Sequence, residues 1–264
     1  MSDIRFIRSV NLRRGRSMVG RLPLIFPVLL AGGFLLACGS QEQASREEPA
    51  TQQDAVSQES AAAPRGAVLT EVPERVDPGG RYLFYLHGQI VEDQGPRPEH
   101  PQLGIYEYQV IRDTLAAGGL NVISEARQAG TDVWTYAQKV KGQVEKLLAA
   151  GVPPQRIIVA GHSKGGAIAI LTSSLLQNDR INFVFLACCG DWMIANPRVD
   201  LRGRILSIYD TGDEFAFPCQ RAFQHTDHPL DAREIEIDTG WGHGAFYRPM
   251  AEWLEPMMTW VKER

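Results

Sequence analysis

Short apolar runs that alternate with segments of helical spacing constrain the fold of this chain more than any other feature. The continuous apolar runs are residues 82–86, 121–124, 156–160, 181–186 and 204–209, followed by a weaker run at 234–237. A strand that is apolar at every position is typical of a sheet covered on both faces, as parallel sheets are. The runs therefore predict the strands of a mostly parallel sheet.

The segments between these runs carry the signals of helices. From Thr131, which we expect to act as a helix cap, apolar side chains recur every three or four positions until Gly151 ends the pattern. Further helices are expected after Ser163 and over residues 246–260. Strands and helices in alternation predict a doubly wound α/β sheet with helices on both faces, to which residues 66–80 could add antiparallel edge strands.

The first residues have the composition of a signal peptide. Basic residues up to Arg21 precede an uncharged run, residues 22–37, that is too short and too rich in Gly and Pro for a membrane-spanning helix. We therefore assign residues 1–37 to a signal peptide, with Met18 as an alternative start. The run ends in LLAC at residues 35–38, which resembles the lipobox of bacterial lipoproteins. In that family the signal is cut before the Cys, and its thiol is lipidated.

This resemblance implies that Cys38 carries a lipid anchor, which would hold the protein at a membrane of the bacterial cell envelope, outside the cytoplasm. A plain secretory signal, giving a secreted or periplasmic soluble protein, is the alternative. Residues 38–66 lack aromatic side chains and apolar periodicity, so they predict a disordered tether. The folded domain is then expected at residues 67–264.

The charge of the chain is divided unevenly. Residues 1–37 hold six Arg and one Asp, so the net charge of −4 for the whole chain leaves −9 on residues 38–264. Domains that bind nucleic acid carry a basic surface instead. The sequence therefore predicts no nucleic-acid partner. The expected partners are a membrane, through the anchor, and a small molecule.

A serine flanked by glycines stands between the run at 156–160 and the following helix, in the motif GHSKG at residues 161–165. In a strand–turn–helix context this G-x-S-x-G pattern holds the Ser in a strained turn, where larger residues at the Gly positions would clash. The Ser hydroxyl then stands at the N-terminus of the helix, whose free N–H groups favour an oxyanion. The pattern predicts that Ser163 is a nucleophile.

With this motif in this context, the sequence from about residue 80 to 264 resembles the α/β-hydrolase serine enzymes. Their catalytic residues follow one another in the order Ser, acid, His. The resemblance implies that Ser163 is the nucleophile, that Asp213 in a loop after a late strand is the acid, and that His243 before the last helix is the base.

Two backbone N–H groups bind the oxyanion in such an enzyme. One is expected from Lys164, the residue after the nucleophile. The other is expected from Gln89, because His87-Gly88-Gln89 follows the run at 82–86 and resembles the H-G-x element of the family. His87 itself is then expected to be a structural residue of the loop.

Several other side chains have an expected place near this site. Asp210 and Asp238 are rival candidates for the acid. His162 is expected to pack under the turn, and the polar stretch at 92–100 to rim the mouth of the site. Aromatic residues that either line a pocket for the acyl group or fill the core are Trp192, Phe215 and Trp241.

The cysteines fit an exported protein. If Cys38 carries a lipid, three cysteines remain, and an odd count in an oxidising compartment predicts one bridge and one buried thiol. Cys188 and Cys189 follow one strand and Cys219 lies in the loop after the next. A bridge from one of this pair to Cys219 is expected, with Cys189–Cys219 as our candidate.

The expected reaction is hydrolysis of a carboxylic ester or related acyl bond through an acyl-enzyme, without a metal or other cofactor. His225 and His228 form too weak a pattern for a metal site. Only residues 190–204 separate two predicted strands, so we expect a minimal domain with an open cleft and no cap domain. The alternatives are thioesterase, amidase or peptidase activity of the same triad, and a non-catalytic binding lipoprotein of the envelope.

Overall fold

Seven parallel strands form the central sheet of the computed structural model, which describes residues 66–263 of the 264-residue chain. In the order in which they lie side by side, the strands are β1 (Val68–Leu69), β5 (Asn121–Ile123), β2 (Tyr82–Leu86), β6 (Ile157–His162), β7 (Asn182–Leu186), β8 (Arg204–Asp210) and β9 (Asp231–Ile237). Every neighbouring pair is parallel. Each predicted strand is present. A separate antiparallel hairpin pairs β3 (Glu99–His100) with β4 (Gly104–Ile105).

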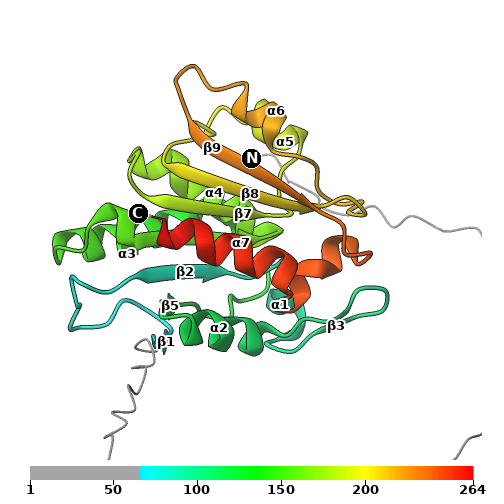
Figure 1. The fold of residues 1–264 in the computed structure, drawn as a ribbon, viewed down its shortest axis with the longest axis horizontal. Helices are drawn as coiled ribbons and strands as arrows, with labels where there is room; N and C mark the ends of the chain where they lie inside the picture. Colours follow the sequence, from blue (N-terminus) through cyan, green and yellow to red (C-terminus); the bar gives the residue numbers. More distant parts are fainter. Residues whose placement is uncertain (1–65, 264) are drawn as a thin grey trace, which may run out of the picture. The chain divides into compact units, whose positions relative to one another are not determined.

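Helices cover both faces of this sheet (Figure 1). The helices are α1 (Gln89–Gln94), α2 (Tyr108–Ala117), α3 (Val133–Ala149), α4 (Lys164–Leu176), α5 (Asp191–Ala195), α6 (Gln220–Phe223) and α7 (Ala251–Lys262), with the 3-10 helices η1 (Pro154–Arg156) and η2 (Gly242–Tyr247). Helices α2 and α7 pack on one face, and α3 and α4 pack on the other. The prediction of a doubly wound, mostly parallel α/β sheet with helices on both faces is confirmed.

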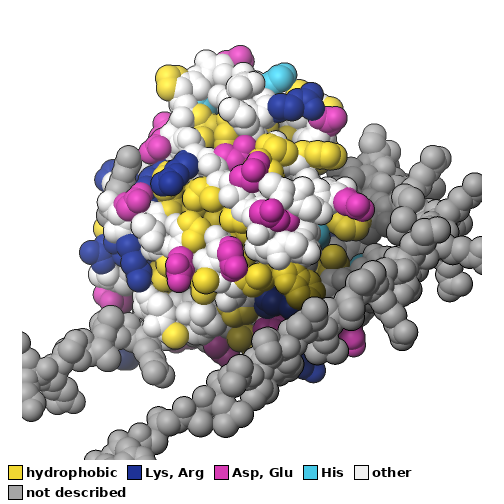
Figure 2. Space-filling model, turned by 45° about the vertical axis from the view of Figure 1, so that its right-hand side comes forward, with side chains coloured by type: hydrophobic (Ala, Val, Ile, Leu, Met, Phe, Trp, Pro, Cys, Tyr) yellow, Lys and Arg dark blue, Asp and Glu magenta, His cyan; other side chains and the backbone are white. Residues whose placement is uncertain are grey.

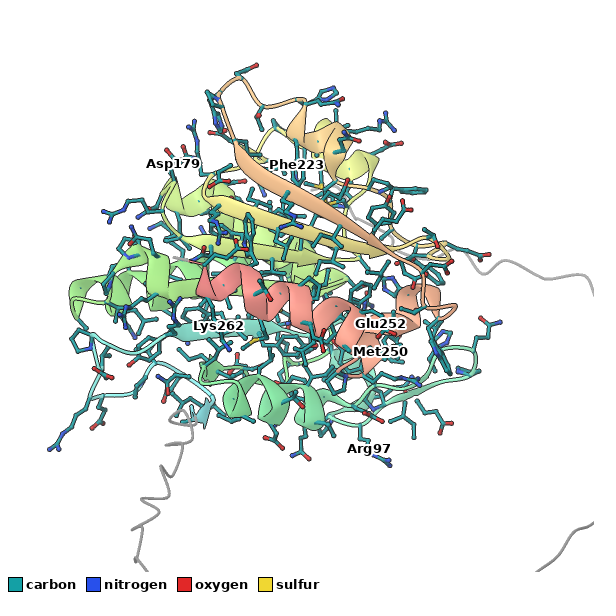
Figure 3. All side chains as sticks on the ribbon, in the orientation of Figure 1. Arg97, Asp179, Phe223, Met250, Glu252 and Lys262 are labelled. Atoms are coloured by element: carbon teal, nitrogen blue, oxygen red, sulfur yellow. A yellow bond between two sulfur atoms is a disulfide. The ribbon has the colours of Figure 1, made fainter. Side chains whose placement is uncertain are left out.

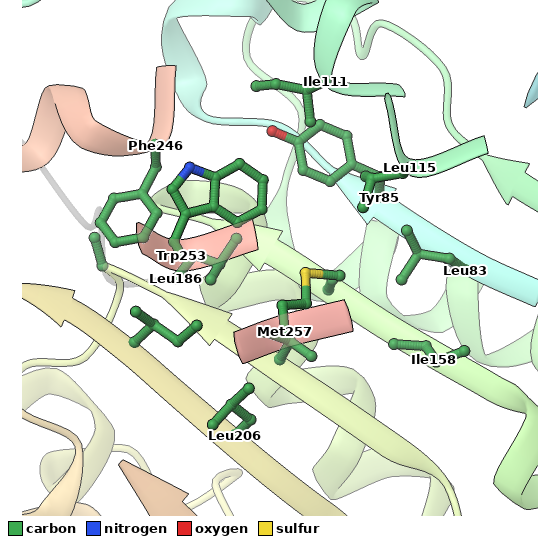
Figure 4. Close-up of a cluster of buried hydrophobic side chains, with 14 of the residues drawn as sticks. Leu83, Tyr85, Ile111, Leu115, Ile158, Leu186, Leu206, Phe246, Trp253 and Met257 are labelled. Carbon is green, nitrogen blue, oxygen red and sulfur yellow. The ribbon is translucent and has the colours of Figure 1, made fainter. Parts of the chain in front are cut away.

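The core has two layers, one on each face of the sheet. On β2, Leu83 and Tyr85 face the layer under α2 and α7, whereas Tyr82 and Phe84 face the layer under α3 and α4. Figure 4 shows part of the first layer, where Trp253 of α7 lies over the strands. Because successive side chains of a strand point to opposite faces, a strand between two layers needs apolar residues at every position. This explains the continuous apolar runs.

Three local expectations were wrong. The cap of α3 is Asp132 rather than Thr131, because the Asp132 carboxylate accepts the N–H of Thr135 at 2.8 Å while the Thr131 hydroxyl donates elsewhere. Strand β1 runs parallel to β5, so residues 66–80 contribute no antiparallel edge. Helix α7 begins at Ala251, because Phe246 lies in the separate helix η2 and Met250 has an extended backbone as the N-cap of α7.

The connection between β7 and β8 contains α5 and no further domain in the described part of the chain, which is the minimal form expected. The predicted signal peptide (1–37), Cys38 and the tether as far as residue 65 lie outside the described residues. No helix within residues 66–263 is both long and apolar enough to cross a membrane. On the face drawn in Figure 2, acidic and basic side chains are interspersed with apolar ones.

Candidate active site

Ser163 occupies a strained turn between β6 and α4. Its φ of 54° and ψ of −122° lie in a region that costs a residue with a side chain about 1–3 kcal/mol. A Cβ on Gly161 would overlap the carbonyl oxygen of Gly165, and a Cβ on Gly165 would overlap that of Leu86. The two glycines are therefore required by the close approach of three backbone segments. The Ser163 N–H donates to the carbonyl of Leu186 at 3.0 Å, which fixes the turn against β7.

The hydroxyl of Ser163 stands at the start of α4. Ser163 is the N-cap residue by position, but its side chain makes no capping hydrogen bond. The first N–H groups of a helix have no acceptor within that helix, and they carry the positive end of the helix dipole. The hydroxyl is therefore free for chemistry beside a positive potential.

Asp213 and His243 form a hydrogen-bonded pair at the ends of β8 and β9. His243 Nδ1 lies 2.8 Å from Asp213 Oδ2, and the Asp213 side chain is fully buried. The other carboxylate oxygen accepts the N–H groups of Phe215 and Ala216, at 2.7 and 3.1 Å. The backbone thus fixes the carboxylate, and the carboxylate fixes the imidazole with its proton on Nδ1. Nε2 is left as the proton acceptor.

The rival carboxylates lie elsewhere. Asp210 accepts the N–H of Gly212 at 2.8 Å, and both the N–H and the hydroxyl of Thr239, at 2.9 and 2.6 Å. It therefore joins the turn after β8 to the turn after β9. Asp238 is exposed. Of the three carboxylates, the structure brings only Asp213 to His243.

His243 lies beside the turn that carries Ser163. Its ring centroid is 4.6 Å from that of His162, the residue before the nucleophile. His162 is buried among aromatic rings, as expected, and its Nδ1 lies 3.4 Å from the Tyr106 hydroxyl. Burial lowers the pKa of His162 well below its ordinary value. No hydrogen bond joins Ser163 to His243 within residues 66–263. In enzymes with a Ser–His pair, that bond often tightens only when substrate is bound.

The two residues expected to bind the oxyanion begin two neighbouring helices. Gln89 is the first residue of α1, and Lys164 is the first residue of α4. Strands β2 and β6 are paired, with Leu86 opposite Gly161, so the segments that follow them lie side by side. Both N–H groups belong to a first helical turn, where the helix itself offers no acceptor.

His87 is a structural residue of the loop before Gln89. Its ring is buried, and Nε2 accepts the backbone N–H of Arg127 at 2.9 Å. The ring proton therefore lies on Nδ1, which donates to the carbonyl of Gly88 at 2.8 Å. Burial, reinforced by the Arg127 charge, lowers the pKa of His87 to about 3, so the ring is neutral at ordinary pH.

Sequence reasoning missed a buried ion-pair cluster beneath this loop. Glu92 was expected at the rim of the site, within residues 92–100, but its side chain is fully buried and pairs with Arg127 at 2.7 Å and with Lys164 at 2.5 Å. Arg97, from the same stretch, is exposed and projects outward (Figure 3). No local signal distinguished Glu92, because its partners are 35 and 72 residues away.

One exposed aromatic side chain, Phe215, lies beside His243. The Phe215 ring lies 5.3 Å from the His243 ring, and Phe215 is 56% exposed. Trp241 and Phe217, which the sequence analysis did not single out, are also exposed. Trp192 instead packs against the core layer under α3 and α4. Of the three predicted aromatics, Phe215 thus lies beside the site, Trp192 packs in the core, and the Trp241 ring lies 4.1 Å from the Arg248 guanidinium.

The structure joins Cys189 to Cys219 in a disulfide and leaves Cys188 as a buried thiol. Burial raises the pKa of this thiol. The backbone N–H of Phe217 also donates to the carbonyl of Cys189 at 3.0 Å, so the loop that begins with Asp213 is tied to the end of β7.

His225 and His228 contact different partners. His225 Nδ1 bonds to the carbonyl of Arg221 at 2.9 Å, and His228 Nε2 bonds to Asp200 at 3.1 Å. Within residues 66–263, no group of three or more His, Cys, Asp or Glu side chains is placed to hold a metal ion.

Part of the sequence is similar to lipases. Residues 105–199 match the model of the family described as Lipase (class 3). This segment contains Ser163 and its turn, and it ends before Asp213 and His243. The sequence matches no curated protein.

Among solved structures, the Pyrococcus furiosus esterase Pf2001 has a TM-score of 0.48 at 16% identity, covering 70% of this chain and 84% of its own. Est1E from Butyrivibrio proteoclasticus, solved with ferulic acid, has a TM-score of 0.48 at 13% identity and covers 73% and 91%. Arabidopsis thaliana SOBER1 has a TM-score of 0.46 at 13% identity and covers 70% and 98%. Structures with TM-scores below 0.5 are too distant to identify the fold. The fold is identified by the order of its strands and by the turn at Ser163.

Proposed function

We propose that this protein is a serine hydrolase that cleaves carboxylic esters through Ser163, His243 and Asp213. The observation that carries the proposal is the pair of Asp213 and His243, joined at 2.8 Å beside the strained turn of Ser163. A nucleophile at a helix N-terminus, a base held in one tautomer and a buried carboxylate that orients it are the parts that acyl transfer needs.

The proposed reaction begins with attack of Ser163 Oγ on the ester carbonyl carbon while His243 Nε2 takes the hydroxyl proton. The oxyanion that forms accepts the N–H groups of Gln89 and Lys164. Collapse of this intermediate breaks the bond to the alcohol, which leaves with the proton from His243. Water then attacks the acyl-enzyme and gives a proton to His243, which returns it to Ser163 Oγ as the bond to the acyl group breaks and the acid leaves.

Ester hydrolysis is favoured over other acyl chemistry on two grounds. Part of the chain is similar to lipases, and the exposed ring of Phe215 beside the base offers a contact to an apolar acyl or alcohol group. Thioesters, amides and peptides would use the same three residues, so a matched set of ester, thioester and anilide substrates with one acyl group distinguishes them.

A fluorophosphonate probe tests the nucleophile. We expect the purified domain to be labelled at Ser163 and the Ser163→Ala variant to be unlabelled. Ser174→Ala is a matched control, because Ser174 lies on the same α4 helix with its hydroxyl bonded to the carbonyl of Ile170. Labelling that persists in Ser163→Ala, or a folded wild type that neither reacts with the probe nor hydrolyses any substrate, would contradict the proposal and favour a binding protein.

We further propose that Cys38 carries a lipid that holds the domain at the bacterial envelope. The disulfide between Cys189 and Cys219 supports export, because such bonds persist in oxidising compartments. We expect Cys38→Ser to release the protein from membranes or to block processing. A mature N-terminus that mass spectrometry maps to another residue would rule this out.

The short β7–β8 connection supports an open cleft. Hydrolysis of a short-chain ester is expected to rise smoothly with concentration through the solubility limit of the substrate. A jump in rate at micelle formation would require a lid that the described residues do not contain.

A further inference from the structure

A single buried carboxylate connects the two segments that supply the proposed oxyanion donors. Glu92 Oε1 accepts from Arg127 Nε at 2.7 Å, and Glu92 Oε2 accepts from Lys164 Nζ at 2.5 Å. The side chains of Glu92 and Arg127 are fully buried, and that of Lys164 is 17% exposed. Lys164 belongs to the segment of the nucleophile, and Glu92 belongs to α1, which begins with Gln89.

Arg127 extends this connection to the loop before α1. Its guanidinium donates to the carbonyl of His87, and its backbone N–H donates to His87 Nε2 at 2.9 Å. Arg127 therefore fixes both the main chain and the ring of His87. With Nε2 occupied, the Nδ1–H of His87 donates to the carbonyl of Gly88 at 2.8 Å.

The carbonyl of Gly88 determines where the N–H of Gln89 points. In a trans peptide the C=O and the following N–H point in opposite directions. The Gly88 oxygen is held by His87 Nδ1 and by the N–H of Val91 at 3.3 Å. The N–H of Gln89 must then point away from these partners, and its direction cannot change while the His87 ring stays in place.

From these contacts, and resting on the function proposed above, we infer that Glu92 and Arg127 are positioning residues for the oxyanion site. They hold the N–H of Gln89 and the N–H of Lys164 in a fixed mutual geometry before substrate arrives. The charges of Glu92, Arg127 and Lys164 sum to +1, so the cluster also places a positive charge beside the developing oxyanion. Donors fixed in advance are effective because they need not reorganise during the reaction.

The inference differs from a purely structural ion pair in what it predicts for kinetics. Loss of a pair that only stabilises the fold lowers the melting temperature, but each folded molecule keeps its turnover number. Loss of a positioning residue lowers kcat per folded active site, because the oxyanion forms after substrate binds. It also weakens the binding of a trifluoromethyl ketone, which forms a tetrahedral oxyanion on the serine.

The test uses Glu92→Gln and Lys164→Met, which removes the ammonium but keeps the backbone N–H. Active sites are counted with the fluorophosphonate, and a short-chain aryl ester gives kcat and KM. We expect kcat to fall by about 10- to 100-fold in both variants, less than the loss of a whole donor. We expect KM to change by less than about twofold and the affinity for the trifluoromethyl ketone to fall in parallel with kcat.

Glu145→Gln is the matched control, since Glu145 forms an exposed ion pair with Lys141 on α3. It should leave kcat and inhibitor affinity unchanged. In the double variant Glu92→Gln/Lys164→Met, the loss should resemble that of Glu92→Gln alone, because the two side chains act as one unit.

Folded Glu92→Gln and Lys164→Met with wild-type kcat would overturn the inference. If Glu92→Gln fails to fold, Lys164→Met decides, because it retains the pair of Glu92 with Arg127; wild-type kcat in that variant would overturn it equally. A wild type that is labelled and active, with unaffected variants, removes this inference alone. A wild type that is neither labelled nor active contradicts the proposed function as well.

Discussion

The turn at Ser163 and the loop at His87–Gln89 form two sides of the candidate site, and they are built in different ways. The turn is made by residues 161–166, where a side chain at Gly161 would overlap the backbone of Gly165 and one at Gly165 would overlap the backbone of Leu86 on the paired strand β2. The loop is held by polar contacts from residues 35 and 40 positions along the chain, and its link to Lys164 spans 72 positions. Shape determines the first side, and buried charge determines the second.

This difference shows why one half of a site can be recognised in a sequence and the other cannot. A steric requirement on adjacent residues leaves a local pattern, here G-x-S-x-G. A requirement for a buried charge can be met from anywhere in the chain, so it leaves no pattern. The pair of Asp213 and His243 lies between these cases. The order Ser, acid, His in the enzymes that the sequence resembles predicts the loop in which each residue lies, and the tertiary contacts show which carboxylate meets His243.

The largest expected effect is the loss of turnover when Asp213, the proposed acid, is replaced. Asp213→Asn should keep the fold but favour the wrong tautomer of His243, which in a serine protease costs about 10⁴-fold in turnover. Asp210→Asn and Asp238→Asn should cost less, because neither side chain is bonded to His243. Turnover and melting temperature of the three variants provide the check. A greater loss in Asp210→Asn at equal stability would exclude Asp213 as the acid.

The next largest effect is expected from a side chain added in the turn at Ser163. Gly165→Ala places a Cβ against the carbonyl oxygen of Leu86 and should lower the free energy of unfolding by about 3 kcal/mol or more, because backbone on both sides must move. Gly142→Ala on α3, where nothing lies within 4 Å of an added Cβ, should instead raise it by about 0.5–1 kcal/mol. Urea denaturation measures both. A Gly165→Ala variant as stable as the wild type would show that shape does not dictate the turn.

A loss of stability of similar size is expected when the disulfide between Cys189 and Cys219 is removed. Cys189 and Cys219 are 30 residues apart, and removing both should lower the free energy of unfolding by about 3–4 kcal/mol. Cys188→Ala keeps the bond and should cost less. Thermal unfolding of the two variants measures this difference. Equal losses would show that the bond does not stabilise the loop.

The smallest expected effect is a change in how stability depends on pH, caused by His87 in the loop at His87–Gln89. The pKa of His87 is lowered from 6.5 to about 3, so the unfolded chain binds a proton there that the folded chain does not. The free energy of unfolding should therefore be greatest above pH 6.5 and fall as the pH decreases toward 3. His87→Asn should show a shallower decline between pH 6.5 and 5 in denaturation series, while His162 keeps part of it. An unchanged slope would mean that His87 does not contribute.

Much of the fold could be predicted because its causes are local. A strand buried on both faces must be apolar at each position, and so Tyr82–Leu86 was recognised with its observed bounds. The cap of α3 was misplaced by one residue, because Thr131 and Asp132 can both cap and only the carboxylate contact to Thr135 decides. Helix α1 was missed, since its few residues are mostly polar and one of them, Glu92, is buried.

The sequence by itself determined six strands of the sheet (β2 and β5–β9), helices α3, α4 and α7, the turn at Ser163 and the loops in which Asp213 and His243 lie. The strands, the helices and the turn follow from rules that nearby residues must obey, namely periodicity and turn geometry. The loops of Asp213 and His243 follow from the order of catalytic residues in the enzymes that the sequence resembles. Only the tertiary structure decided that Asp213 rather than Asp210 meets His243, and that Glu92, Arg127 and Lys164 gather beside the loop at His87–Gln89. These contacts depend on where distant segments cross. The energy of a buried charge depends on that crossing and not on its neighbours in the chain.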